Sequence, residues 1–193
     1  DALRFNTTAS NNTAVGKDAL RANTTGTENV ATGKGALQAN TTGSYNHAFG
    51  ANAGYAITTG STNIAIGNAA LGTATTASGN TAVGHSALTA NTSGSSNVGV
   101  GANVLDANTT GASNTAVGES AGTNLINGNY NAFVGKDAGA GCTSGESNVA
   151  LGFRSLYTSN TANKNVAIGD SALRAFSGSG DGNNTAVGHS ALT

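Results

Sequence analysis

An asparagine returns every 17 residues along this chain, and a glycine follows four residues behind each one. The asparagines are Asn12, Asn29, Asn46, Asn63, Asn80, Asn97, Asn114, Asn131, Asn148 and Asn165, and then Asn184 after a step of 19. The glycines are Gly16, Gly33, Gly50, Gly67, Gly84, Gly101, Gly118, Gly135, Gly152, Gly169 and Gly188. A fixed short period of this kind predicts a stacked array of identical units rather than a globular core.

The composition supports the same architecture. Of the 193 residues only 9% are charged, against roughly 25% in ordinary domains, and there is no Pro, Met or Trp. Few large apolar side chains are available, so a thick core cannot form. Order must come from backbone hydrogen-bond ladders and from stacked small residues.

One unit, from residue 12 to residue 28, reads N-T-A-V-G-K-D-A-L-R-A-N-T-T-G-T-E. We number its positions from the first Asn. Positions two to four are β-prone, the glycine at position five ends that run, and Asn-Thr-Thr-Gly at positions twelve to fifteen indicates a turn. We therefore predict an all-β, parallel β-solenoid or β-roll of about eleven 17-residue coils, one repeat array over residues 1–193, with a longer turn at 177–183. At about 4.8 Å per coil it would be roughly 50 Å long.

Three columns are expected to hold the coils together. The position-one asparagines would form a ladder of side-chain amide hydrogen bonds from coil to coil, and the glycines would turn the chain. A leucine column at position nine and an apolar column at position four would fill the interior. The position-four column comprises Val15, Ile66, Val83, Val100, Val117, Val134, Leu151, Ile168 and Val187.

Position three is alanine in nearly every unit, with Gly99 and Phe133 as the exceptions. Because alternate residues of a strand point to opposite sides, this column would lie on the face opposite to positions two and four. Two interpretations stay open. The alanine face packs against other copies of the chain around an axis, which predicts a trimer, or it is the half-exposed side of a single-chain solenoid.

The repeat N-T-A-V-G-x-x-A-L-x-x-N-T-T-G resembles repeats of long fibrous proteins of phage tails and bacterial surfaces. Its opening, N-T-A-V-G or N-I-A-I-G at residues 63–67, is also similar to the head repeats of trimeric autotransporter adhesins. Those heads are parallel β-rolls with three chains to a fibre, in units shorter than 17 residues. The resemblance implies a trimeric fibre and carries over no binding residue.

The sequence predicts no enzyme and no cofactor. Eight Lys and Arg among nine acids give a net charge of −1 and no basic stripe, which argues against nucleic-acid binding. No apolar run is long enough for this segment to insert into a membrane. His47, His85 and His189 lie too far apart for a metal or catalytic pair. Residues 177–183, S-G-S-G-D-G-N, are interpreted as a longer turn or a Ca²⁺ loop.

Two surface features suggest binding. Threonines recur at positions thirteen and fourteen, as in Thr24 and Thr25, and a regular threonine array is typical of some ice-binding proteins. Exposed tyrosines could stack on the sugar rings of cell-surface glycans. These are Tyr45 and Tyr130 at position seventeen, and Tyr55 and Tyr157 at position ten.

The leading hypothesis is a structural, adhesive fibre segment on a cell surface, a virion or an extracellular filament, a stiff shaft that displays binding regions. Its partner would be itself, as a homotrimer. The alternatives are a subunit that stacks head to tail through open coil ends into a filament, and a monomeric ice- or glycan-binding solenoid. Both ends of the sequence fall within a unit, so we expect a segment of a longer protein.

Overall fold

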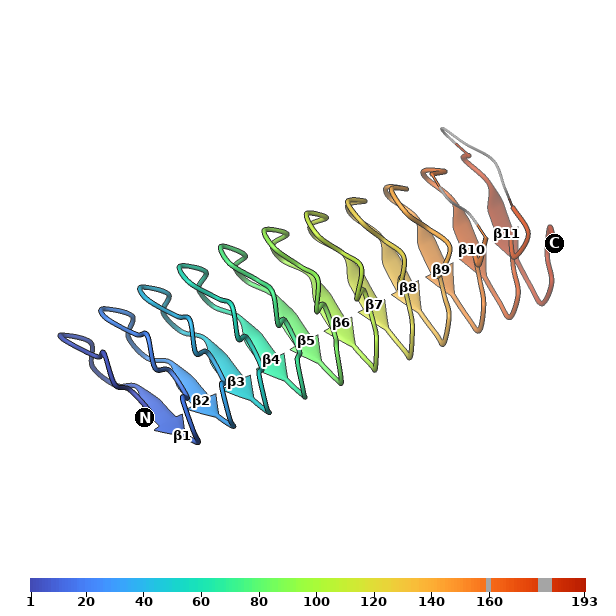
Figure 1. The fold of residues 1–193 in the computed structure, drawn as a ribbon. Coiled ribbons are helices and arrows are strands. Elements are labelled where there is room, and N and C mark those ends of the chain that lie inside the picture. Colours follow the sequence, from blue (N-terminus) through green and yellow to red (C-terminus); the bar gives the residue numbers. More distant parts are fainter. Residues whose placement is uncertain (159–160, 177–181) are drawn as a thin grey trace.

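The computed structural model describes residues 1–158, 161–176 and 182–193. In these residues it is an all-β parallel solenoid of about ten turns with no helix, which confirms the predicted fold class (Figure 1). Each turn contributes one three-residue strand, and the strands pair in chain order into a single sheet. They are β1 (Thr13–Val15), β2 (Val30–Thr32), β3 (His47–Phe49), β4 (Ile64–Ile66), β5 (Thr81–Val83), β6 (Val98–Val100), β7 (Thr115–Val117), β8 (Ala132–Val134), β9 (Val149–Leu151), β10 (Val166–Ile168) and β11 (Thr185–Val187).

The strands are in strict register. Thr13 pairs with Val30, Ala14 with Ala31 and Val15 with Thr32, and the same pattern continues to β11. Parallel pairing of this kind requires a crossover between strands, and the other fourteen residues of each coil supply it as turns. The longer turn predicted at 177–183 falls largely outside the described residues.

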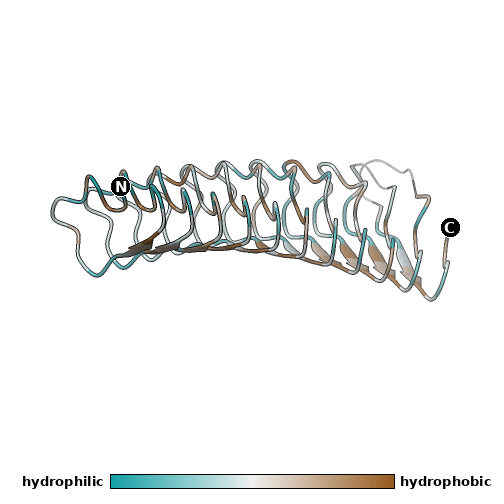
Figure 2. Ribbon diagram, turned by 60° about the horizontal axis from the view of Figure 1, so that its bottom comes forward, coloured by the Kyte–Doolittle hydropathy of each residue, from teal (hydrophilic) through white to brown (hydrophobic). Residues whose placement is uncertain are grey.

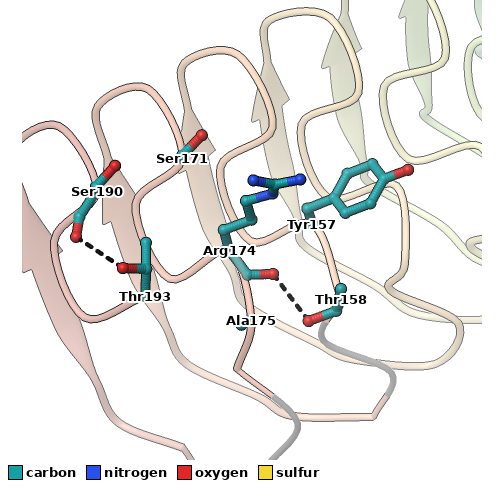
Figure 3. Close-up of a pocket in the computed structure, with 7 residues that line it drawn as sticks. All are labelled: Tyr157, Thr158, Ser171, Arg174, Ala175, Ser190 and Thr193. Atoms are coloured by element: carbon teal, nitrogen blue, oxygen red, sulfur yellow. Dashed lines mark hydrogen bonds between the residues drawn. The ribbon is translucent and has the colours of Figure 1, made fainter.

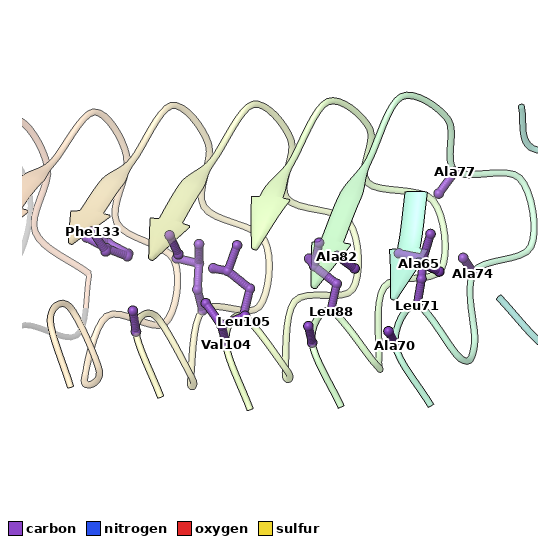
Figure 4. Close-up of a cluster of buried hydrophobic side chains, with 14 of the residues drawn as sticks. Ala65, Ala70, Leu71, Ala74, Ala77, Ala82, Leu88, Val104, Leu105 and Phe133 are labelled. Carbon is purple, nitrogen blue, oxygen red and sulfur yellow. The ribbon is translucent and has the colours of Figure 1, made fainter. Parts of the chain in front are cut away.

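The interior lies between the strands and the segment that carries positions eight and nine (Figure 4). From the strand side, position three points inward: Ala31, Ala48 and Ala116 have no exposed surface. From the other side come the leucines, as predicted. The fully or almost fully buried members are Leu20, Leu37, Leu71, Leu88, Leu105, Leu156 and Leu173.

The predicted interior column at position four is wrong. Val15 is 57% exposed and Ile66 40% exposed, because positions two and four both point away from the coil. The alanine column is correspondingly not a second outer face. A coil this thin leaves only a methyl group's space between the strand and the opposing leucine, so the small residue lies inside and the β-branched residues lie outside.

The glycine at position five turns the chain out of each strand. Gly16 and Gly50 have φ values of 125° and 138°, a region that side chains rarely adopt. A Cβ on Gly50 would also lie 2.6 Å from the carbonyl oxygen of Gly67 in the next coil. Both the conformation and the contact between coils therefore require glycine here.

Candidate functional site: an outward sheet face and a gapped surface column

The outward side of the sheet is a long, flat, uncharged surface, which we call the sheet face and define as positions two and four of every strand (Figure 2). It contains no Asp, Glu, Lys or Arg, and His47 is its one titratable side chain. Most of its residues are β-branched. The exposed large members are Val15, Phe49, Ile64, Ile66, Val100, Val117, Val134, Val149, Leu151 and Val187.

This surface is unusual in its continuity. Exposed apolar residues scattered singly are normal in soluble proteins, whereas contiguous patches mark contact sites. Here the register places each apolar residue beside another in the next strand, as with Val149 beside Val166 and Leu151 beside Ile168. Sequence reasoning placed half of this surface in the core and so missed it.

The position-one asparagines lie at the inner edge of the sheet and link each coil to the next. The backbone N–H of Asn29 donates to Oδ1 of Asn12 at 2.9 Å, and Nδ2 of Asn29 donates to the carbonyl of Gly43 at 2.9 Å. The same pair of bonds recurs up to Asn148, and the backbone bond continues to Asn165, whose N–H donates to Oδ1 of Asn148. The members from Asn29 to Asn165 are buried, so this ladder is structural and offers nothing to a ligand.

A second asparagine ladder, at position twelve, was interpreted from sequence only as a turn. Nδ2 of Asn40 donates to Oδ1 of Asn23 at 2.9 Å and to the carbonyl of Gly43 at 2.9 Å. The ladder stops where the next coil has an apolar residue, Ile57 after Asn40 and Leu125 after Asn108. Oδ1 of Asn40 and Oδ1 of Asn108 are accordingly buried without a hydrogen-bond partner.

Many hydroxyls of the threonine array donate hydrogen bonds to backbone carbonyls of the next coil. The Oγ1 of Thr24 donates to the carbonyl of Thr41 at 3.0 Å, and the same carbonyl accepts from the N–H groups of Thr24 and Thr25. The pattern repeats with Thr41 donating to Thr58. Position-thirteen hydroxyls are thus committed to the coil, whereas the position-fourteen residues, such as Thr25 and Thr42, are exposed to solvent.

The four tyrosines lie in two separate columns that the fold does not bring together. Tyr45 and Tyr130, at position seventeen, are 52% and 68% exposed. Tyr55 is exposed and Tyr157 half-buried, and each lines a hollow on the surface of the position-ten column. A further hollow of about 400 Å³ lies on the other side of Tyr157, beside Arg174 (Figure 3).

Charged residues lie on the turns, where they pair between neighbouring coils. Nζ of Lys136 donates to Glu119 at 2.9 Å, which raises the pKa of Lys136, and Nε of Arg154 lies 3.3 Å from Asp137. Among the described residues no three His, Cys, Asp or Glu side chains gather closely enough to hold a metal ion. The suggested Ca²⁺ loop lies mostly outside those residues.

Comparison with known proteins identifies no family for this chain. The chain matches no protein-family model, and searches of curated proteins and of solved structures return nothing similar. In the described part of the chain no helix is long and apolar enough to cross a membrane.

Proposed function

We propose that this chain is a non-enzymatic structural segment of an extracellular, cell-surface or virion fibre, and that it assembles with copies of itself through the sheet face. The observation that carries the proposal is the face itself, an uncharged β-branched surface that runs through all the strands from β1 to β11. Solvent exposure of such a surface is costly, and flat two-sided apolar sheets are normally covered on both sides.

A second copy of the chain is the partner that fits best. The face repeats once per strand, about every 4.8 Å, over its whole length. Side chains of another surface interdigitate with it throughout only if that surface has the same period. An identical chain has that period by construction, which is how stacked sheets form dry interdigitated interfaces.

The area is sufficient for a specific contact. Three residues of strand give a width of about 10 Å, and eleven strands a length of about 50 Å, so each copy offers about 500 Å² in projection. Two such faces together reach the roughly 1,000 Å² at which specific interfaces begin. Three copies closing around a common axis, the number that the family resemblance implies, would bury all three faces in one core.

The assembled rod would act mechanically. Hydrogen-bonded ladders run along its axis in the sheet, in both asparagine columns and in the threonine column, so tension along the axis is shared among many bonds. The turns, which carry the charged residues and tyrosines, would remain on the outside as the surface available to host or substrate.

The test is the solution mass of the chain across a dilution series, by light scattering. We expect a discrete mass of three times 18.6 kDa that does not change with concentration. Val100→Lys and Val117→Lys place a charge in the middle of the face and should give the mass of one chain. Thr110→Lys, on an exposed turn, is the matched control and should leave the mass unchanged.

Circular dichroism of each variant establishes that it keeps its strands. One chain mass for the unaltered protein at every concentration would overturn the proposal. A mass that climbs steadily with concentration, insensitive to the two valine substitutions, would overturn it in favour of stacking through the coil ends.

A further inference from the structure

The surface column at position ten contains two gaps of the same construction. Tyr55 is followed one coil later by Gly72 and two coils later by Thr89. Thr123 is followed one coil later by Ala140 and two coils later by Tyr157. Elsewhere this position carries large side chains such as Arg21, Gln38 and Arg174. In both places a small residue therefore leaves a space between a tyrosine and a threonine.

Both spaces are of ligand size. The first, which we call the Tyr55 gap, has a volume of about 470 Å³ and is lined also by Lys34, Gln38 and Asn52. The second, the Tyr157 gap, has a volume of about 490 Å³ and is lined also by Asn124 and Asp137. Small-molecule sites typically measure about 300–1,000 Å³.

The tyrosine of each gap is held by a neighbouring side chain, from the preceding coil at Tyr55 and from the same coil at Tyr157. Nε2 of Gln38 donates to the hydroxyl of Tyr55 at 3.3 Å. The guanidinium carbon of Arg154 lies 5.4 Å from the centroid of the Tyr157 ring, and its Nε donates to Asp137 Oδ2 at 3.3 Å. These contacts limit the motion of the rings before any ligand arrives, which reduces the entropy that binding must overcome.

The lining of both gaps combines one aromatic ring with hydroxyl, amide and charged groups. Such a ring offers a flat apolar surface with a polar end. A pyranose has the complementary shape, with C–H groups on its flat faces and hydroxyls around its edge. An apolar ligand would cover the polar groups of the lining without hydrogen-bonding to them, and a phosphate would meet Asp137 in the second gap.

We propose that the Tyr55 gap and the Tyr157 gap are two saccharide-binding sites, each of which takes one pyranose ring against its tyrosine. Their centres, at Gly72 and Ala140, lie four coils apart, roughly 20 Å at about 4.8 Å per coil. Two weak sites on one stiff rod bind a long or densely presented glycan far more tightly than either does alone. The inference is independent of self-assembly, because position ten lies on the turns and not on the sheet face.

The experiment uses the full chain with its tyrosines labelled for NMR. Four tyrosines and no tryptophan make the ring signals assignable with single Tyr→Phe variants. The probes are methyl glycosides of glucose, galactose, mannose and N-acetylglucosamine, titrated to high millimolar concentration. We expect at least one of them to shift the Tyr55 and Tyr157 signals saturably while Tyr45 and Tyr130 stay unchanged.

Two substitutions test separately whether binding requires the space and whether it requires the tyrosine ring. Ala140→Gln fills the second gap with a side chain that the column already carries at Gln38, and it leaves Tyr157 in place. It should weaken binding there at least tenfold without affecting the Tyr55 signal. Tyr157→Ala should do the same, and Tyr130→Ala, the control at an exposed tyrosine away from either gap, should have no effect.

The proposal is overturned if no glycoside of the panel moves the Tyr55 or Tyr157 signals, or if all four tyrosines shift alike. It is equally overturned if Ala140→Gln leaves the affinity at Tyr157 unchanged. These outcomes are measured independently of the solution mass, so failure of saccharide binding and failure of self-assembly can be distinguished.

Discussion

The ring of Phe133 fills space that Gly139 of the same coil leaves open. A Cβ on Gly139 would lie 2.7 Å from atoms of that ring, and one on Gly122 would lie 2.9 Å from it. Position three is otherwise alanine or glycine, and position nine is otherwise leucine in most coils. One large residue from the strand has therefore replaced leucines from the opposite side, at nearly constant interior volume.

The first prediction concerns this exchange. Phe133→Ala should lower the free energy of unfolding by about 3–5 kcal/mol, because it opens a cavity beside two glycines. Gly139→Leu alone should lower it by about 1–3 kcal/mol or more through overpacking. The double variant restores the usual alanine and leucine and should lie within about 1.5 kcal/mol of the original protein.

Urea unfolding of the four proteins measures the coupling directly. Leucine is acceptable in this conformation, since Leu37 and Leu88 adopt φ values of 50° and 52° at the same position. If the effects of the two single changes simply add in the double variant, the exchange of volume described above is incorrect.

The second prediction compares two asparagines that donate to one carbonyl. Nδ2 of Asn97 and Nδ2 of Asn108 lie 2.8 Å and 3.0 Å from the Gly111 oxygen. Oδ1 of Asn97 also accepts from the backbone N–H of Asn114 at 2.9 Å, whereas Oδ1 of Asn108 has no partner. Asn97→Ala should therefore cost about 2–4 kcal/mol and Asn108→Ala about 1–2 kcal/mol.

Chemical denaturation again provides the measurement, with amide hydrogen exchange at Asn114 as a local one. Exchange there should accelerate in Asn97→Ala and stay slow in Asn108→Ala. Equal costs for the two substitutions would mean that the Oδ1 acceptor contributes nothing to the ladder.

The third prediction concerns the single cysteine. Burial raises the pKa of the Cys142 thiol from 9.0 to about 11, so at pH 8 only about one thiol in a thousand is the reactive thiolate. A thiol reagent should label the folded protein slowly, at a rate set by local opening, and the urea-unfolded protein rapidly. Labelling at the same rate in both states would contradict the buried position.

The same shift has a consequence for stability at high pH. The folded-state pKa lies above the unfolded value, so the contribution of the neutral thiol is complete below about pH 9 and is lost as the pH rises to about 11. Cys142→Ala should remove this part of the pH dependence.

The fourth prediction concerns backbone strain at position seventeen. Thr62 has a φ of 58°, a conformation that is costly for a β-branched residue, by about 1–2 kcal/mol. Asn11 adopts φ 60° at the same position in the first coil, and asparagine tolerates it better. Thr62→Asn should raise the free energy of unfolding by about 0.5–1 kcal/mol.

Thr59→Asn is the matched control, since Thr59 is exposed on a turn with no positive φ and should change stability by less than about 0.5 kcal/mol. Thermal unfolding of both variants is sufficient. A gain of the same size in the control would indicate a general effect of asparagine rather than relief of strain at residue 62.

The period of the asparagines predicts the fold because it acts through the backbone. A residue that must hydrogen-bond to its own copy in the next coil, as Asn29 does to Asn12, fixes the length of the coil whatever the other positions contain. The leucine column followed for the same reason: Leu20 and Leu37 are the largest apolar side chains of their units and need an interior.

The direction of the strand side chains could not be predicted from one unit. Thr-Ala-Val gives no clear polar side, because threonine and valine are nearly the same shape and alanine suits either environment. A comparison of different units does indicate which side chains point inward. Gly99 at position three coincides with Val104 in place of the usual alanine at position eight, and a Cβ on Gly99 would lie 3.1 Å from Val104 Cγ1. Compensation of this kind places positions three and eight in one interior.

The gaps at Gly72 and Ala140 were missed for a related reason. Sequence reasoning treated Tyr55 and Tyr157 as isolated rings, whereas the fold makes each one a neighbour of the residue one unit away. Only the stacked arrangement turns a small residue in one coil into a space beside an aromatic ring in the next.

Because each strand pairs only with the strands one unit before and after it, the length of this molecule can change during evolution by whole coils. Deleting or duplicating 17 consecutive residues anywhere before Asn165 joins equivalent positions, so one whole coil is lost or gained. Recombination between copies of the repeat would then produce shorter and longer solenoids that all fold, so the length of the molecule can change without any new residue type.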